Sequence, residues 1–122
     1  MLVYISGKIG PDGITPEVKE KFARVEQLLR EKGNKVINPA SDSYQYSLKL
    51  ASFKTMCKDS EFFGQMLGDS YTIALAHGIM SIIVADAIAF LPDFRSSPGA
   101  KAEYYFSKAI GKPRLYIKIN NN

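Results

Sequence analysis

The 122-residue sequence contains one cysteine, one histidine and no tryptophan. Cys57 has no second cysteine with which to form an internal disulfide, and a single unpaired thiol is typical of the reducing cytoplasm. One histidine and one cysteine do not provide the spaced ligands of a zinc site. We therefore expect a cytoplasmic protein that needs neither a metal nor another cofactor.

The sequence also lacks long apolar runs and clusters of basic residues. Its N-terminus has neither the basic flank nor the apolar core of a signal peptide, and its most apolar stretch, residues 72–91, includes Asp86, which is costly in a bilayer. The 16 Lys and Arg residues outnumber the 12 Asp and Glu residues, but they are spread along the chain. We expect no membrane and no nucleic-acid polymer as partner, whereas a small anionic substrate fits this charge.

The length of the chain and the order of its apolar segments predict a single α/β domain over residues 1–122. Segments of helical periodicity begin after Thr15 and Ser97, each of which precedes a proline at the first helical position. Short apolar runs between them favour strands at residues 2–6, 35–37, 86–91 and 114–119. This pattern predicts a three-layer sandwich with flavodoxin-like topology and a parallel sheet in the strand order 2-1-3-4.

In such a sheet, ligands bind at the carboxyl ends of the strands where the winding reverses, which here lies between the first and third strands. The loops at residues 7–14 and 92–99 border this crevice. The first is rich in glycine but is neither a Walker A loop nor a GxGxxG motif. The second leads into the helix capped by Ser97, whose free N-terminal amides suit an anion such as a phosphate.

Glu103 is the carboxylate nearest to this predicted anion site. It follows Gly99 by four residues and therefore lies on the same face of the helix. A carboxylate beside an anion-binding helix start suits a sugar phosphate or a nucleotide. The alternative interpretation is an ordinary capped helix with an exposed glutamate.

The segment from residue 40 to residue 68 is the least regular part of the sequence. Its aromatic and methionine side chains show no clear period, which predicts broken helix plus loop. These side chains fit the packing of a lid or a subunit contact better than stacking on a base, which stays an alternative. They are Tyr44, Tyr46, Phe53, Met56, Phe62, Phe63 and Met66.

The chain resembles the nucleoside 2-deoxyribosyltransferase-like superfamily, and within it most closely the small DUF4406 branch of bacteria and phages. The resemblance covers all but residues 41–68 and rests on VYISGKI near the start, VINPA at 36–40, DAIAFLPDF…SSPGAKAE at 86–103 and AIGK at 109–112. Its most specific part is the element from Ser97 to Glu103. A similar element occurs in the deoxynucleoside 5′-monophosphate N-hydrolases, whereas the transferases carry aspartate at the position of Ser97.

The resemblance implies a role for each matching residue. Glu103 matches the nucleophile that attacks the anomeric carbon of a deoxyribosyl group, by the logic of a retaining glycosidase. Ser97 and Gly99 match positions that hold the 5′-phosphate. The remaining matches line the sugar and base pocket or shape the end of the second strand, and they are Tyr4, Gly7, Lys8, Ile9 and Asn38.

One position departs from the pattern of these enzymes, which usually carry an aspartate eight residues before the position of Asp86. Gly78 occupies that position here. His77 and Asp69 are the remaining candidates for a catalytic acid or base. A structural histidine and a helix-capping aspartate are the alternatives for these two residues.

The resemblance therefore implies hydrolysis or transfer at the N-glycosidic bond of a deoxynucleoside or its 5′-monophosphate. Hydrolysis is favoured, because Ser97 replaces the aspartate of the transferases. The alternatives are a catalytically inactive nucleotide-binding module, which the loss of the acid at Gly78 would explain, and a structural homologue without a ligand. Related enzymes are homo-oligomers with shared pockets, so we also expect a homo-oligomer, with residues 44–66 as a candidate interface.

Overall fold

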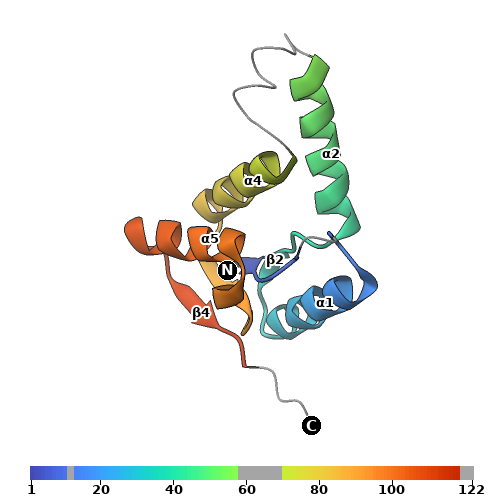
Figure 1. The fold of residues 1–122 in the computed structure, drawn as a ribbon. Coiled ribbons are helices and arrows are strands. Elements are labelled where there is room, and N and C mark those ends of the chain that lie inside the picture. Colours follow the sequence, from blue (N-terminus) through green and yellow to red (C-terminus); the bar gives the residue numbers. More distant parts are fainter. Residues whose placement is uncertain (11–12, 58–69, 119–122) are drawn as a thin grey trace.

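Four parallel strands form the sheet of the computed structural model, which describes residues 1–10, 13–57 and 70–118, with the backbone alone at residues 51–57, 70 and 71. The sheet has the order β2-β1-β3-β4 (Figure 1). This parallel sheet and its order confirm the predicted fold class. The strands are β1 (Leu2–Ser6), β2 (Lys35–Ile37), β3 (Ala87–Phe90) and β4 (Arg114–Tyr116).

Helices cover both faces of the sheet and complete the three layers (Figure 1). Helix α1 (Pro16–Glu31) packs on one face, while α4 (Ser70–Val84) and α5 (Pro98–Ala109) pack on the other. Helix α2 (Asp42–Cys57) follows β2 and packs against α4. The short 3-10 helix η1 (Phe94–Ser96) links β3 to α5.

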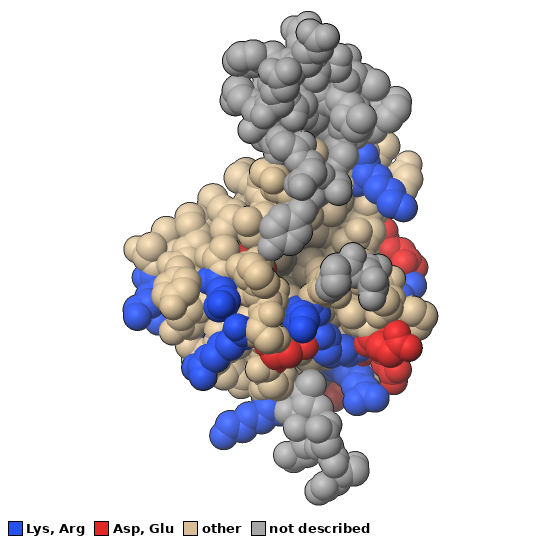
Figure 2. Space-filling view, in the orientation of Figure 1, with Lys and Arg blue, Asp and Glu red and all other residues tan. Residues whose placement is uncertain are grey.

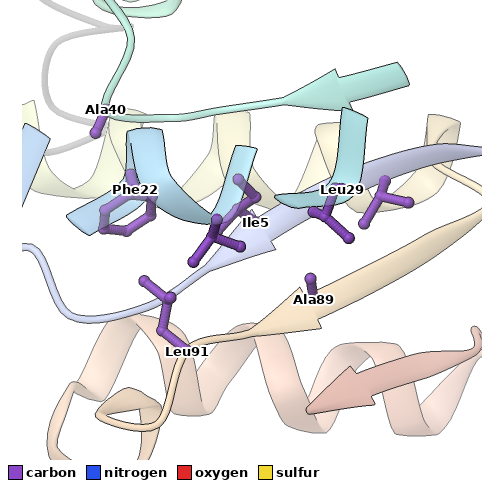
Figure 3. Packing of buried hydrophobic residues seen from close by; sticks show 8 residues of the cluster. Ile5, Phe22, Leu29, Ala40, Ala89 and Leu91 are labelled. Carbon is purple, nitrogen blue, oxygen red and sulfur yellow. The ribbon is translucent and has the colours of Figure 1, made fainter. Parts of the chain in front are cut away.

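The core between α1 and the sheet accounts for the apolar pattern of both elements (Figure 3). Phe22, Val25 and Leu29 recur at helical spacing and form the buried stripe of α1. This stripe packs on Val3 and Ile5 of β1. Because helices cover both faces of the sheet, the central strands are apolar along nearly their whole length rather than alternating with exposed polar residues.

Helix α2 differs from the prediction of a broken helix, because it is continuous from Asp42 to Cys57. Only part of it faces the body of the protein, where Tyr44, Gln45 and Leu48 line a cleft. None of the side chains described on this helix, at residues 42–50, is fully buried, and such a surface gives no clear apolar period in the sequence. The rest of the predicted irregular segment, as well as Asp69, lies outside the described residues.

Charged side chains of both signs share the surface. On the face shown in Figure 2, Lys and Arg side chains form several separate groups, with Asp and Glu side chains between them. Ion pairs one turn apart, such as Glu20 with Arg24, lie on the exposed side of α1. In the part of the chain that the structure describes, no helix combines the length and hydropathy needed to cross a bilayer.

Leu29→Ala should lower the free energy of unfolding by about 2–5 kcal/mol, because it leaves a cavity between α1 and the sheet where the leucine is 4% exposed. The adjacent Leu28 is 38% exposed, so Leu28→Ala is a matched control that should cost well under ~1 kcal/mol. Urea unfolding followed by circular dichroism measures both variants. Equal losses would contradict the packing of α1 through this stripe.

Candidate active site

A cleft of about 760 Å³ opens at the carboxyl ends of β1 and β3, where the sequence predicts the ligand crevice. One side is formed by the loop after β1, and the opposite side by the first turns of α2 together with part of α4. The start of α5 closes a third side. Tyr4 of β1 and Glu103 of α5 lie in its lining. The cleft therefore joins segments from the beginning, the middle and the end of the chain.

The carboxyl group of Glu103 is buried and held by two hydroxyl groups. The Tyr4 Oη atom donates a hydrogen bond to Oε2 at 2.6 Å, and the Ser6 Oγ atom donates one to Oε1 at 3.0 Å. Tyr4 and Ser6 are two residues apart on β1, so both project from the face opposite to the one that meets α1. This alternation brings a pair of hydroxyl donors to the same carboxylate.

Burial changes the acid–base behaviour of this cluster. It raises the pKa of Glu103 to about 7, although the hydrogen bonds from Tyr4 and Ser6 act in the opposite direction. Burial, followed by the negative charge of Glu103, also raises the pKa of Tyr4 well above its usual value. Tyr4 therefore remains a neutral donor, while Glu103 is present in both protonation states near neutral pH.

The start of α5 presents fewer free amides to the cleft than the sequence suggests. The Ser97 Oγ atom accepts a hydrogen bond from the amide of Ala100 at 3.2 Å, as expected of an N-cap. Pro98 has no N–H group, and the amide of Lys101 donates to the carbonyl of Ser97. Within the described residues, the Gly99 amide is left as the available donor of this first turn, beside the Ser97 hydroxyl.

The loop after β1 is tied to the loop after β3 by Asp93, a residue that the sequence analysis did not select. Its Oδ1 atom accepts from the Lys8 amide at 3.0 Å, and its Oδ2 atom pairs with Lys21 Nζ at 2.5 Å. Lys21 Nζ also donates to the Lys8 carbonyl at 2.8 Å. The Lys8 backbone is thereby fixed, while its exposed side chain lies at the cleft.

Gly7 and Ile9 also line the cleft, as the resemblance implies. Gly7 has a further packing reason, because a Cβ atom there would lie 2.4 Å from the Leu91 Cδ1 atom. The glycine thus allows the backbone after β1 to pass closely over the end of β3. Its presence in the sequence reflects packing as well as a position beside the cleft.

Tyr44 of α2 also lines the cleft, although the sequence analysis favoured a packing role for it over stacking on a base. Its hydroxyl lies 3.4 Å from the Ser81 Oγ atom, which donates to the carbonyl of His77 at 2.8 Å. Burial raises the pKa of Tyr44, the contact with Ser81 opposes this, and the charge of Glu103 adds to it. The irregular apolar pattern of residues 40–68 gave no orientation for this helix, so the sequence did not indicate that Tyr44 lies at the cleft.

The other predicted site residues lie elsewhere or outside the described chain. His77 is half-buried on α4 and is not among the described residues that line the cleft. Asn38 is buried at the end of β2, where its side chain donates to Glu26 at 2.9 Å and accepts from the Ala40 amide at 2.9 Å. It shapes the turn after β2, as the resemblance implies. Asp69 lies outside the described residues.

Among the residues described, no three side chains of the types His, Cys, Asp and Glu are grouped so that they could hold a metal ion. The polar groups at the cleft include instead one carboxyl, several hydroxyls, the Gln45 side-chain amide, the Gly99 amide and the ammonium of Lys8. This set can bind an anion at one end and react with an electrophilic carbon through the carboxylate.

The sequence model of a protein family described as a domain of unknown function, DUF4406, matches residues 1–116. The chain therefore belongs to the DUF4406 family. Neither the curated proteins nor the solved structures gave a match.

Glu103→Gln should stabilise the fold more at pH 8 than at pH 5. The pKa of Glu103 is raised to about 7 in the folded protein, so the native state binds the proton more tightly than the unfolded chain does. Its contribution to stability is therefore present at acidic pH and is lost as the pH rises through about 7. A neutral glutamine avoids this loss, which should amount to about 2–3 kcal/mol between the two pH values.

Chemical unfolding at both pH values measures this difference. Glu17→Gln, at an exposed residue of α1, is the control and should show no comparable dependence on pH. A Glu103→Gln effect of equal size at both pH values would contradict a raised pKa.

Proposed function

We propose that this member of the DUF4406 family cleaves the N-glycosidic bond of a deoxynucleoside or its 5′-monophosphate, with Glu103 as the nucleophile. The observation that carries this proposal is the buried Glu103 carboxyl at the cleft, oriented by Tyr4 at 2.6 Å and Ser6 at 3.0 Å. The resemblance of the element from Ser97 to Glu103 to that of deoxynucleoside 5′-monophosphate N-hydrolases supports the same reaction.

In the first step, the ionised carboxylate attacks the anomeric carbon and forms a glycosyl ester. The bond from that carbon to the base breaks, and its electron pair leaves with the base, which takes up a proton. The hydroxyl groups of Tyr4 and Ser6 hold the carboxylate in one orientation, so little ordering is needed before attack. The roles of His77 or Asp69 as proton donor remain predictions from the sequence.

In the second step, water attacks the same carbon and breaks its bond to Glu103. The sugar is released with a new hydroxyl group, the carboxylate is restored, and the water gives up one proton. Attack by a second base in place of water would yield a new nucleoside instead. We favour water, because Ser97 stands where the transferases carry aspartate.

A 5′-phosphate would bind at the start of α5. The Gly99 amide and the Ser97 hydroxyl are donors there, and the helix N-terminus carries partial positive charge. Lys8 brings a full positive charge to the same cleft. Ile9 and Leu75 contribute apolar surface against which the sugar and base would pack.

A nucleotide-binding module without catalysis is the second candidate. Two observations favour it, namely the glycine at position 78 and the raised pKa of Glu103, which leaves part of this group protonated and not nucleophilic at neutral pH. Such a module would bind deoxynucleoside monophosphates without consuming them.

A chromatographic assay for free base tests the proposal. It is run with each of the deoxynucleosides and deoxynucleoside monophosphates as substrate. Glu103→Ala should reduce base release by at least about 100-fold, because the nucleophile is lost.

Wild-type turnover should rise as the pH increases through about 7, because only the ionised carboxylate attacks. Ser97→Ala should raise KM for the monophosphate more than for the nucleoside.

The control for this assay is Glu17→Gln, which should leave turnover unchanged. Undiminished turnover by Glu103→Ala would refute the role of Glu103. If the wild-type protein releases no base but its melting temperature rises with a monophosphate, the binding module is the correct function.

We also propose that the chain acts in the cytoplasm as a homo-oligomer that uses α2 as an interface. Tyr46 is 66% exposed and Leu50 is 43% exposed on this helix, which leaves apolar surface for a second copy of the chain. Light scattering after size-exclusion chromatography should give more than the monomer mass, and Tyr46→Glu should reduce it. Tyr105→Glu, at an exposed residue of α5, is the control, and a wild-type monomer would contradict the proposal.

A further inference from the structure

Gly78 lies in the middle of α4 with its backbone directly against the carboxyl group of Glu103. A Cβ atom at this position would lie 2.4 Å from Glu103 Oε2, 3.0 Å from Tyr4 Oη and 3.2 Å from Glu103 Cδ. The first of these distances is far inside van der Waals contact. No side chain larger than hydrogen therefore fits at position 78 while Glu103 keeps its present place.

A glycine in this position is costly for the helix itself. Glycine loses more backbone entropy than alanine on entering a helix, and the φ angle of Gly78 is not among the positive values that would require glycine. Neither its backbone conformation nor the preferences of a helix explain why position 78 is a glycine. The close contact with the Glu103 carboxyl explains it.

We propose that Gly78 is a positioning residue for Glu103, because its missing side chain creates the recess that receives the carboxyl group between α4 and β1. On the β1 side of this recess, Tyr4 and Ser6 donate hydrogen bonds to the carboxyl. With a methyl group at position 78, the carboxyl would move out of the recess and lose the 2.6 Å bond to Tyr4. The inference rests on the proposed function only for its effect on turnover.

The recess leaves no room for the aspartate that the resemblance implies at position 78. In the present structure the Glu103 carboxyl occupies the space that a side chain at position 78 would take. Gly78→Asp would therefore displace Glu103 rather than restore an acid. The groups that face the carboxyl are the hydroxyls of Tyr4 and Ser6, with Tyr44 as a more distant neighbour that responds to its charge.

Gly78→Ala tests the proposal through the direction in which it changes the melting temperature. An ordinary glycine in a helix is improved by alanine, so the melting temperature would rise. If Gly78 forms the recess, the same substitution should instead lower the melting temperature by at least about 3 °C. In the Glu103→Ala background the contact with the carboxyl is gone, and the remaining 3.0 Å approach to Tyr4 Oη needs only a small shift of a hydroxyl that has lost its partner. Gly78→Ala should then raise the melting temperature.

Ala76→Gly is the matched control, since Ala76 is exposed on the same helix. It should lower the melting temperature equally in both backgrounds, because it changes helix propensity without touching Glu103. A rise with Gly78→Ala in the wild-type background would overturn the proposal. If Gly78→Ala alone does not fold, a folded variant that carries both Gly78→Ala and Glu103→Ala supports the recess. If neither of these variants folds, the proposal is contradicted.

A second readout separates positioning from stability. Carbon-13 NMR of labelled glutamate follows the ionisation of Glu103, whose pKa is about 7 when buried. In Gly78→Ala the displaced carboxyl should gain contact with water, and its pKa should fall toward the ordinary value of glutamate. An unchanged pKa would contradict the proposal. Should the wild-type protein release no base while both readouts hold, the proposed reaction fails and the positioning role stands.

Discussion

A hydrogen bond between two residues 99 positions apart, Tyr4 and Glu103, joins the centre of the sheet to the last helix. Its charged partner is buried, and a buried carboxylate is tolerated only when its oxygens have hydrogen-bond partners. The position of α5 over β1 is therefore constrained by polar chemistry as well as by apolar packing. Tyr4 and Glu103 meet in this way in the lining of the cleft.

The two faces of β1 carry side chains of different kinds. Val3 and Ile5 face α1 and contribute to the apolar core, while Tyr4 and Ser6 face the opposite layer and hold Glu103. One strand can serve both purposes because neighbouring side chains project to opposite faces. A shift of one residue in the pairing of β1 would turn its apolar side chains toward Glu103 and its hydroxyl groups toward α1. The register of this strand is therefore constrained by the contacts on both faces of the sheet.

Much of the fold could be predicted from local signals, such as the strand order and the helix start at Ser97. The placement of Glu103 at the carboxyl ends of the strands followed from the same topology. Contacts between particular side chains of distant segments could not be predicted. Asp93 meets Lys21 across 72 residues, and the contact of Gly78 with Glu103 involves no motif. The place of Tyr44 at the cleft could not be predicted for another reason, because no side chain in the described part of α2, residues 42–50, is fully buried to mark its inner face.

The clamp around Asp93 has a consequence for the thermodynamics of recognition. It fixes the backbone of Lys8 through both its amide and its carbonyl, so the basic end of the cleft is ordered during folding. A ligand that binds at this end need not supply the free energy to order the loop, and more of its interaction energy appears as affinity. In the proposed reaction, selectivity for the anionic group of the substrate would therefore be built into the unliganded protein.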